Sequence, residues 1–222
     1  AYLEQYTISA KVAAEILYTA AYIYDDIIDR TIVDLGCGTG RLAIGAVLLG
    51  AREAVGVDID KVAVKLAQTN AEKMRVKERT HWIIADVDVV HGSFNTVLQN
   101  PPFGVQRRGA DRKFIKKSLE LGCRIYSLHK SVKGSREFFK RLRSRGTGFI
   151  PTQPSPFLKR FIEGHGGKIE AVYAILMTIP HMFEFHRKQK HRFVVDLYVI
   201  EGESFLKNKF SRPKLQKDQT DN

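Results

Sequence analysis

The chain has 222 residues, of which 44% are hydrophobic and 27% are charged, with a formal net charge of +12. This size allows one domain with a substantial core, and two cysteines exclude a disulfide scaffold and a cysteine-rich zinc module. The charge favours a polyanionic partner, either nucleic acid or an anionic membrane surface. The longest apolar stretches reach about half of the roughly 20 residues that span a bilayer, and no signal-peptide pattern is visible, so we expect a cytoplasmic protein outside the membrane.

Strand-like and helical segments alternate along the chain. The predicted helices cover residues 10–24 (with Ser9 as N-cap), 41–49, 61–74, 111–121 and 156–163. The predicted strands cover 31–35, 54–57, 80–85, 94–98, 124–128, 168–179 and 193–200. This alternation predicts an α/β fold with a mostly parallel seven-stranded sheet and helices on both faces. No helix separates the last two strands, so they are expected to form an antiparallel pair at one edge.

The same patterns divide the chain into three parts. Residues 1–30 form an N-terminal helical segment, and residues 31–202 form the main domain. A stretch at about 133–156, rich in Lys, Arg, Gly and Pro, is expected to be a basic insertion. Residues 203–222 are polar and aperiodic, which is typical of a disordered tail.

A glycine-rich segment, DLGCGTG at residues 34–40, follows the first predicted strand and opens a helix. Its glycines, Gly36, Gly38 and Gly40, allow the backbone to turn tightly and to approach a ligand closely. The pattern is GxGxG, and not the GxGxxG that cradles the pyrophosphate of a dinucleotide. The shorter spacing favours a ligand without a pyrophosphate, such as S-adenosylmethionine (SAM). The alternative is a glycine turn that binds nothing.

Three carboxylates near strand ends favour the cofactor site over the empty turn. Asp58 ends the second strand and is expected to accept hydrogen bonds from both ribose hydroxyls. Asp86 ends the third strand and can accept from the adenine amino group. Asp34 is a candidate partner for the positive amino group of the ligand. Asp58 and Asp86, like the glycine turn, lie at carboxyl ends of strands, where open α/β sheets bind their ligands.

The fourth strand runs into Asn100, Pro101, Pro102 and Phe103. The two prolines fix φ and make the loop stiff. The Asn100 side-chain oxygen and the Pro101 carbonyl can accept the two hydrogens of a planar amino group and direct its nitrogen toward an electrophilic methyl group. Phe103 can stack on the face of a base. The alternative is a rigid turn after a strand, but the order of the motifs favours an active site.

In this order, DLGCGTG, VDID, ADV and NPPFG resemble the class I SAM-dependent methyltransferases that act on amino groups. The segments LEQYT at 3–7, YSLHKS at 126–131, FHRK at 185–188 and VDLY at 195–198 are similar to the methyltransferase-like family that includes the 18S ribosomal RNA adenine-N6 methyltransferase and its archaeal relatives. The resemblance covers about residues 3–200 except roughly 133–160. It implies a Rossmann-like class I fold and N6-methylation of an adenine in structured RNA, most naturally small-subunit ribosomal RNA.

The resemblance also implies roles for further residues. Gln5 and Thr7 would close over the methionine end of SAM, as part of the segment 1–30. Gly36, Thr39 and Arg41 would lie along the cofactor. The family usually has one residue between Tyr and Thr in this first motif, whereas here Thr7 follows Tyr6 directly. Eukaryotic members act with a small zinc-binding activator protein that pairs along the sheet edge, which makes such a protein a candidate partner.

Basic residues flank the predicted active site. Arg107 and Arg108 follow NPPFG, while Arg187 and Lys188 belong to the cluster HRKQKHR. Because both loops should border the site, these four side chains are expected to contact RNA phosphates. Other lysines are expected to lie on solvated helix faces. No His/Cys spacing indicates a metal site.

Two other functions remain open from the residues alone. The same loop chemistry suits another planar amino nitrogen, such as guanine N2 or a protein glutamine amide. A non-catalytic RNA-binding module could retain the fold, although intact Asp58 and Asn100 argue against it. His129, after the fifth strand, is expected to be structural, because the predicted chemistry needs no general acid or base.

Overall fold

A computed structural model describes residues 8–103, 109–131, 144, 149–180 and 190–202. Most of the predicted insertion at about 133–156 and all of the predicted tail at 203–222 lie outside these residues. Within the described ranges, no helix has the length and apolar character needed to cross a membrane.

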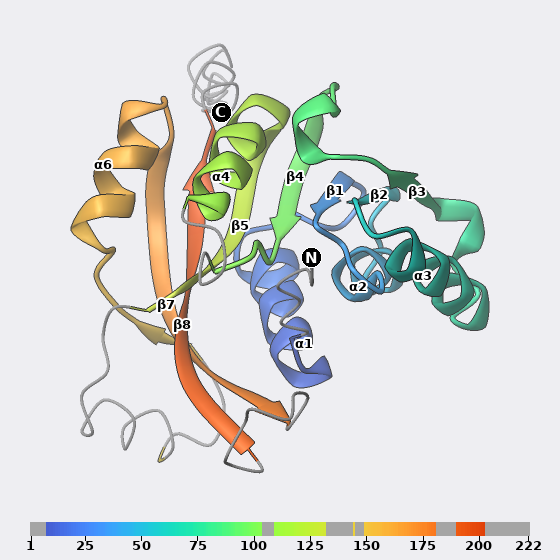
Figure 1. Cartoon of the computed structure of the whole chain (residues 1–222), viewed down its shortest axis with the longest axis horizontal. Coiled ribbons are helices and arrows are strands. Elements are labelled where there is room, and N and C mark those ends of the chain that lie inside the picture. Colours follow the sequence, from blue (N-terminus) through green and yellow to red (C-terminus); the bar gives the residue numbers. More distant parts are fainter. Residues whose placement is uncertain (1–7, 104–108, 132–143, 145–148, 181–189, 203–222) are drawn as a thin grey trace, which may run out of the picture.

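The described elements follow the predicted alternation (Figure 1). The strands are β1 (Thr31–Leu35), β2 (Glu53–Asp58), β3 (Thr80–Ile84), β4 (Phe94–Gln99), β5 (Gly122–Lys130), β6 (Ile150–Pro151), β7 (Lys168–Pro180) and β8 (Lys190–Glu201). The helices are α1 (Ala10–Tyr18), α2 (Arg41–Leu48), α3 (Lys61–Lys73), α4 (Ala110–Leu121) and α6 (Pro156–Gly164), with short turns η1 (Thr19–Ile23), η2 (Lys77–Arg79) and η3 (Val87–Val89).

The described strands form one sheet in the order β3-β2-β1-β4-β5-β8-β7-β6. The first five are parallel, β8 runs antiparallel to β5, and β7 runs antiparallel to β8. The predicted α/β class and the antiparallel pair are confirmed. The predicted count of seven strands is wrong, because β6 pairs with β7 beyond the predicted edge. With two residues, β6 is too short to produce an alternating pattern in the sequence.

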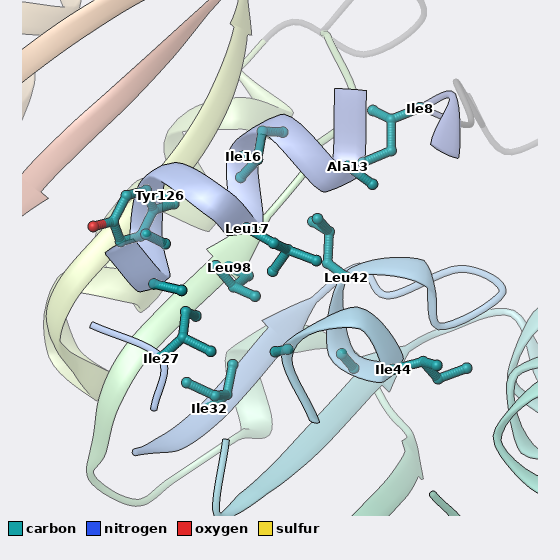
Figure 2. Packing of buried hydrophobic residues seen from close by; sticks show 14 of the residues in the cluster. Ile8, Ala13, Ile16, Leu17, Ile27, Ile32, Leu42, Ile44, Leu98 and Tyr126 are labelled. Atoms are coloured by element: carbon teal, nitrogen blue, oxygen red, sulfur yellow. The ribbon is translucent and has the colours of Figure 1, made fainter. Parts of the chain in front are cut away.

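The sheet separates two hydrophobic clusters. Helices α1 and α2 pack on one face against residues such as Leu98 and Tyr126, as Figure 2 shows. Helices α4 and α6 pack on the other face, where Ile115 and Ile162 meet Ile125. Burial of both faces explains why the central strands read as nearly continuous apolar runs.

The N-terminal helical segment differs in one detail from the prediction of a single helix over residues 10–24. The Ser9 hydroxyl caps α1 by accepting a hydrogen bond from the Val12 N–H at 3.3 Å, as expected. From Thr19 to Ile23, however, the chain widens into a π-helical turn. The Asp26 N–H then bonds to the Ala20 carbonyl at 2.8 Å, which closes a loop wider than an α-helical turn.

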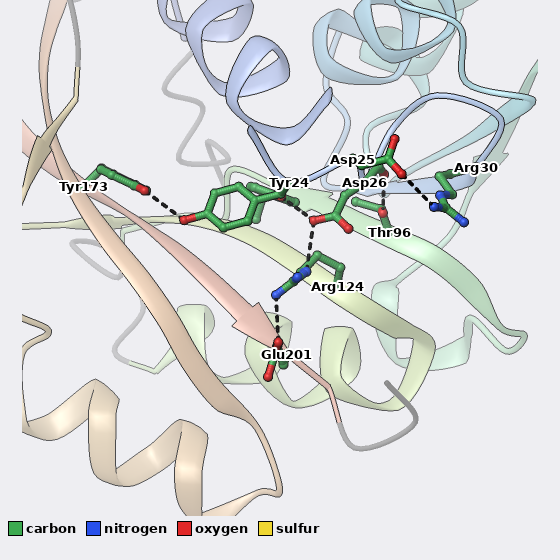
Figure 3. A network of polar contacts seen from close by, with 9 residues as sticks. Tyr24, Asp25, Asp26, Arg30, Thr96, Arg124, Tyr173 and Glu201 are labelled. Atoms are coloured by element: carbon green, nitrogen blue, oxygen red, sulfur yellow. Dashed lines mark hydrogen bonds and ion pairs between the residues drawn. The ribbon is translucent and has the colours of Figure 1, made fainter. Parts of the chain in front are cut away.

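A buried polar network fastens this segment to the sheet (Figure 3). Asp26 accepts a hydrogen bond from the Tyr126 hydroxyl at 2.6 Å and lies 2.9 Å from Arg124 Nε. Arg124 also lies 3.3 Å from Glu201 on β8, and the Tyr24 hydroxyl is 2.8 Å from that of Tyr173. Arg124 is near the amino end of β5, so this network lies at the end of the sheet opposite the glycine turn.

Candidate cofactor and methyl-transfer site

The two predicted motifs begin side by side. In the parallel register of β1 and β4, Leu35 pairs with Gln99. The next residues are Gly36, which starts the glycine turn, and Asn100, which starts the NPPF loop. Because neighbouring strands lie about 4.8 Å apart, the sheet brings the start of the candidate cofactor turn next to the start of the candidate substrate loop.

The glycine turn adopts the conformation that its residues permit. Gly36, Gly38 and Gly40 have φ values of +69°, +52° and +81°, in the left-handed region that strains other residues. The Gly36 and Cys37 N–H groups both donate to the Val57 carbonyl at the end of β2, at 2.8 and 3.0 Å. The turn is thereby held at the carboxyl ends of β1 and β2.

Packing also requires a small residue at Gly40. A Cβ atom there would overlap the Trp82 ring, and so would a Cβ atom at Gly56 on β2. The indole therefore fills the space that both glycines leave. Gly38 is different, because a Cβ atom there would meet nothing within 4 Å. The backbone at Gly38 thus faces open space that a ligand can approach.

Asp58 is prepared to accept further hydrogen bonds. Its Oδ2 accepts from the Gly38 N–H at 2.7 Å, and its Oδ1 accepts from the Asp60 N–H at 2.9 Å. Each carboxylate oxygen has two lone pairs, so both oxygens keep acceptor capacity while the backbone fixes their orientation. This arrangement fits the two vicinal hydroxyls of a ribose.

Asp34 lies deeper than the sequence suggests. The residue is 1% exposed, and its Oδ2 accepts a hydrogen bond from the Ala43 N–H of α2 at 3.1 Å. Burial raises its pKa to about 7; the Ala43 N–H opposes this rise and the charge of Asp58 adds to it. A positive group placed nearby would favour the ionised carboxylate. Its role toward a cofactor amino group stays a prediction.

Asp86 has a partner that the sequence did not indicate. It accepts a hydrogen bond from the Asp88 N–H at 3.0 Å and so caps the short turn η3. Lys113 of α4 places its Nζ 2.5 Å from Asp86 Oδ1 and 2.9 Å from Asp88 Oδ2. Partial burial lowers the pKa of Lys113, but the two carboxylates outweigh this effect and the pKa is raised. The ion pair joins α4 to the segment that follows β3.

Phe114 is a second contribution of α4. A Cβ atom at Gly36 would lie 3.1 Å from Phe114 Cε1, so the ring packs directly against the glycine turn. Helix α4 therefore contacts both the turn after β1 and the carboxylate after β3. The sequence places this helix soon after the NPPF segment, but it does not show which face of the helix meets the turn.

The NPPF loop starts from a rigid support. Pro101 is buried, while Asn100, Pro102 and Phe103 are partly buried. The Phe103 ring packs edge to face on Phe193 of β8, with centroids 5.9 Å apart and planes at 81°. The described loop residues thus have a fixed aromatic ring beside the predicted amino-group acceptors.

A neutral polar network holds the end of β4 behind this loop. Gln99 Nε2 donates to the Ser127 hydroxyl at 2.8 Å, and Ser127 Oγ lies 2.7 Å from His129 Nε2. His129 Nδ1 lies 3.9 Å from Asp111 Oδ2, and this carboxylate favours the tautomer with the proton on Nδ1, in which Nε2 accepts from the Ser127 hydroxyl. Burial lowers the pKa of His129 to about 3. A histidine that stays neutral in this way agrees with the expected structural role.

Other predicted residues are less well placed by the structure. Gln5, Thr7, Arg107, Arg108, Arg187 and Lys188 lie outside the described residues. The Thr39 carbonyl accepts a hydrogen bond from Asn70 Nδ2 at 3.1 Å. Arg41, at the start of α2, donates to the Ile8 carbonyl. This bond places the beginning of the described chain beside the glycine turn.

Comparison with known proteins decides the family. The rRNA N6-adenosine-methyltransferase METTL5 of Danio rerio is 30% identical over 200 residues, covering 87% of this chain and 86% of that protein. Mettl5 of Drosophila melanogaster, with the same activity in its name, is 31% identical over 206 residues, covering 90% and 86%. The chain belongs to the METTL5 family. An uncharacterised protein of Methanocaldococcus jannaschii is 37% identical over 215 residues, covering 91% of this chain and 86% of that protein.

Solved structures agree with membership of the METTL5 family. A Pyrococcus horikoshii protein classed provisionally as an RNA methyltransferase has a TM-score of 0.73 and 34% identity, covering 90% of this chain and 87% of that chain. Magnesium protoporphyrin IX methyltransferase of Synechocystis, solved with bound SAM, has a TM-score of 0.60 at 15% identity, covering 87% of this chain and 79% of that chain. The second likeness shows the fold alone. The predicted class I methyltransferase fold is confirmed.

One further match concerns only part of the METTL5-family chain. Residues 22–100 match the model of the ribosomal protein L11 methyltransferase family (PrmA). This range contains the glycine turn, Asp58 and Asp86, and it ends at Asn100. The likeness to PrmA therefore covers the candidate cofactor region and stops where the substrate loop begins.

Proposed function

We propose that this protein transfers a methyl group from SAM to the N6 amino group of an adenine in ribosomal RNA, with small-subunit ribosomal RNA as the substrate. The observation that carries the proposal is the pairing of Leu35 with Gln99 in a chain of the METTL5 family. This register supports a methyl donor on the glycine turn and a methyl acceptor at Asn100. The family's named members methylate the N6 of adenosine in rRNA.

The residues at the turn fit SAM. The carboxylate of Asp58 suits the ribose hydroxyls, and that of Asp86 suits the adenine amino group. The open space at Gly38 leaves room for the bound molecule. SAM supplies an electrophilic methyl group on a sulfonium sulfur. The bond from Arg41 to the Ile8 carbonyl supports the related proposal that residues 1–30, with Gln5 and Thr7, close over the cofactor.

The protein's own part in the reaction is to position the nucleophile. The Asn100 side-chain oxygen and the Pro101 carbonyl accept the two N6 hydrogens, which turns the nitrogen lone pair out of the ring plane toward the methyl carbon. Phe103 stacks on the adenine and fixes its plane. The new N–C bond forms as the S–C bond breaks, and the nitrogen then releases one proton to water. Because no base is needed before attack, catalysis depends mainly on proximity and orientation.

The decisive experiment uses labelled SAM with total cellular RNA and protein, followed by nucleoside and peptide analysis. We expect the label in N6-methyladenosine of small-subunit rRNA. Label in N2-methylguanosine or methylated glutamine, or no label at all, would contradict the proposal.

Arg107, Arg108, Arg187 and Lys188 are proposed RNA contacts, so charge reversal at the last two should raise the RNA Kd and reduce its salt dependence.

The role of Asn100 is tested separately. Asn100→Ala should lower kcat by at least about 100-fold, by analogy with the loss of one group that stabilises a transition state, while SAM binding stays nearly intact. Asn95→Ala is the matched control, because Asn95 lies at the opposite end of β4 and bonds to Thr31 at 2.9 Å. Loss of SAM binding in the Asn100 variant would show that Asn100 has a different role.

We also infer that the edge strand β3 receives a small zinc-binding activator protein. Among the described strands, β3 lies at one end of the sheet, and it exposes Ile83 by 42% and Ile84 by 50%. Ile83→Lys should prevent a complex with such a protein from the same genome, whereas Ile23→Lys, at a 61% exposed position on η1, should not. We expect the reaction to take place in the cytoplasm.

A further inference from the structure

A row of flat side chains lies on α6 and ends at α4. Phe157, Phe161 and His165 are spaced four residues apart, so they lie on the same side of the helix. The two phenyl rings stack with centroids 6.3 Å apart and planes at 20°, and Phe161 meets His165 at 4.3 Å. Arg112 of α4 places its guanidinium carbon 5.9 Å from the centre of the Phe157 ring.

The outer end of this row is open to solvent. Phe157 is 51% exposed, and Arg112 is exposed as well. One exposed phenyl ring is ordinary on a protein surface. Here the Phe157 ring is aligned with the Phe161 ring and has the Arg112 guanidinium close by, so the flat groups together form a preformed stacking surface. Exposed Lys116, four residues after Arg112 on α4, and exposed Arg160, three residues after Phe157 on α6, add positive charge on the same sides of their helices.

The row is placed at the active-site end of the sheet. In Figure 1 the amino ends of α4 and α6 point toward the end at which β4 finishes. Just before α6, the Ser155 N–H donates to the Tyr198 hydroxyl at 2.9 Å. The Tyr198 ring packs edge to face on His129 with centroids 5.3 Å apart. His129 reaches Gln99 through Ser127, so packed side chains connect the start of α6 to the residue before Asn100.

We propose, on the basis of the proposed function, that Phe157 and Arg112 form a stacking platform for an unpaired nucleotide next to the target adenine. Presenting a base to the NPPF loop takes it out of its stack and leaves the neighbouring base with an exposed face. Phe157 replaces the lost stacking partner. The Arg112 guanidinium is planar and cationic, so it can stack on the base or contact the adjacent phosphate.

The test measures steady-state methylation of a short RNA that contains one target adenine. Phe157→Leu keeps an apolar side chain but removes the ring, so KM should rise roughly 5- to 150-fold, the equivalent of about 1–3 kcal/mol of stacking, while kcat changes little. Arg112→Lys keeps the charge but loses the plane, and it should raise KM by a smaller factor. Tyr22→Leu is the matched control, because Tyr22 is 56% exposed on η1, against the opposite face of the sheet.

The position of the stacked nucleotide is found with RNAs that lack one base at a time. One abasic position beside the target should raise the wild-type KM as much as Phe157→Leu does. The same RNA should cause no further loss in the Phe157→Leu variant, because both changes remove the same contact. A 2-aminopurine at that position should be quenched on binding to the wild type but not to the variant.

Three results would overturn the platform. They are an unchanged KM in Phe157→Leu, additive losses at every abasic position, and an equal rise of KM in Tyr22→Leu. Failure of the proposed function looks different, because the wild-type protein would then leave the adenine N6 unmethylated, and both proposals would fall. Methylation by the wild type together with any of the three results refutes the platform alone.

Discussion

Asp34 gives the sharpest test of the electrostatics of the site. Its carboxylate is buried under the glycine turn, and burial raises its pKa from the ordinary 3.8 to about 7. Because a tenfold change in proton affinity corresponds to about 1.4 kcal/mol, this rise is worth roughly 4 kcal/mol. The folded protein binds a proton here that the unfolded chain has released. The contribution of Asp34 to stability is therefore complete below pH 3.8 and is lost as the pH rises to about 7.

The wild-type pH profile alone would conceal this effect. Burial lowers the pKa of His129 from 6.5 to about 3, so its contribution has the opposite sign. It is present above pH 6.5 and is lost as the pH falls toward 3. Between about pH 4 and 6.5 the two slopes nearly cancel. The informative quantity is the difference in free energy of unfolding between the wild type and Asp34→Asn, since the variant is neutral at this position at every pH.

The assay is urea unfolding of both proteins at several pH values from 4.5 to 8. The Asn side chain can still accept from the Ala43 N–H, and its other packing effects do not depend on pH. Relative to the wild type, the variant should gain about 3 kcal/mol between pH 4.5 and pH 8. A difference that stays constant over this range would refute the reasoning, and so would a relative loss at pH 8.

The same pair of proteins tests the predicted role of Asp34 toward the cofactor. If the positive amino group of S-adenosylhomocysteine lies near Asp34, binding favours the ionised carboxylate and releases a proton near pH 7. Affinity should then rise from pH 6 to pH 8 in the wild type and stay flat in Asp34→Asn. Calorimetry in buffers of different ionisation enthalpy counts the released proton. Equal pH dependence in the two proteins would remove Asp34 from the cofactor site.

Three further predictions concern other parts of the structure. Asp58→Ala should weaken S-adenosylhomocysteine by at least about tenfold in calorimetry, because the ribose loses both acceptors; unchanged affinity would disprove the ribose assignment. In spectra of protein with 15N-labelled histidine, His129 should stay neutral and protonated on Nδ1 from pH 5 to 8, whereas titration near pH 6.5 would contradict its burial. Asp26→Ala should lower the free energy of unfolding by about 3 kcal/mol, because it removes one of the two carboxylates that balance the buried charge of Arg124. Cofactor affinity should be preserved, because the network lies at the opposite end of the sheet. A loss below about 0.5 kcal/mol would mean that the ion pair contributes little.

The secondary structure is largely predictable because most elements bury a continuous apolar face and end at recognisable residues. Ser155 and Pro156 mark the start of α6, and Gly50 lies just beyond α2, where the patterns place them. Two details escape the patterns. The π-helical turn from Thr19 to Ile23 leads into the contacts of Tyr24 and Asp26 with distant strands, which no local sequence encodes. The short strand β6 depends entirely on its pairing with β7.

The candidate site, like the secondary structure, has some features that the sequence predicts and others that it does not. The glycine turn and the carboxylate of Asp58 are predictable, because a parallel sheet gathers the carboxyl ends of its strands at one edge. The contacts of Lys113 and Phe114 are not predictable, because they depend on how α4 is rotated against the sheet. A weak signal does exist, since Lys113 and Lys117 are four residues apart and both reach the segment after β3, Lys117 through the Val90 carbonyl at 3.3 Å. Only the structure shows that this face of α4 meets Asp86.

The placement of Asn100 rests on groups that carry no charge. The prolines restrict the dihedral angles within the loop, and the chain from Gln99 through Ser127 to His129 holds the strand from which the loop begins. Neither the restricted proline dihedral angles nor these hydrogen bonds depend on salt concentration, and His129 stays neutral because burial holds its pKa at about 3. RNA capture by a chain of charge +12 is by contrast electrostatic and sensitive to salt. The protein therefore separates the two tasks, so that changes in ionic strength affect how often the substrate arrives and leave the geometry of the reacting amine intact.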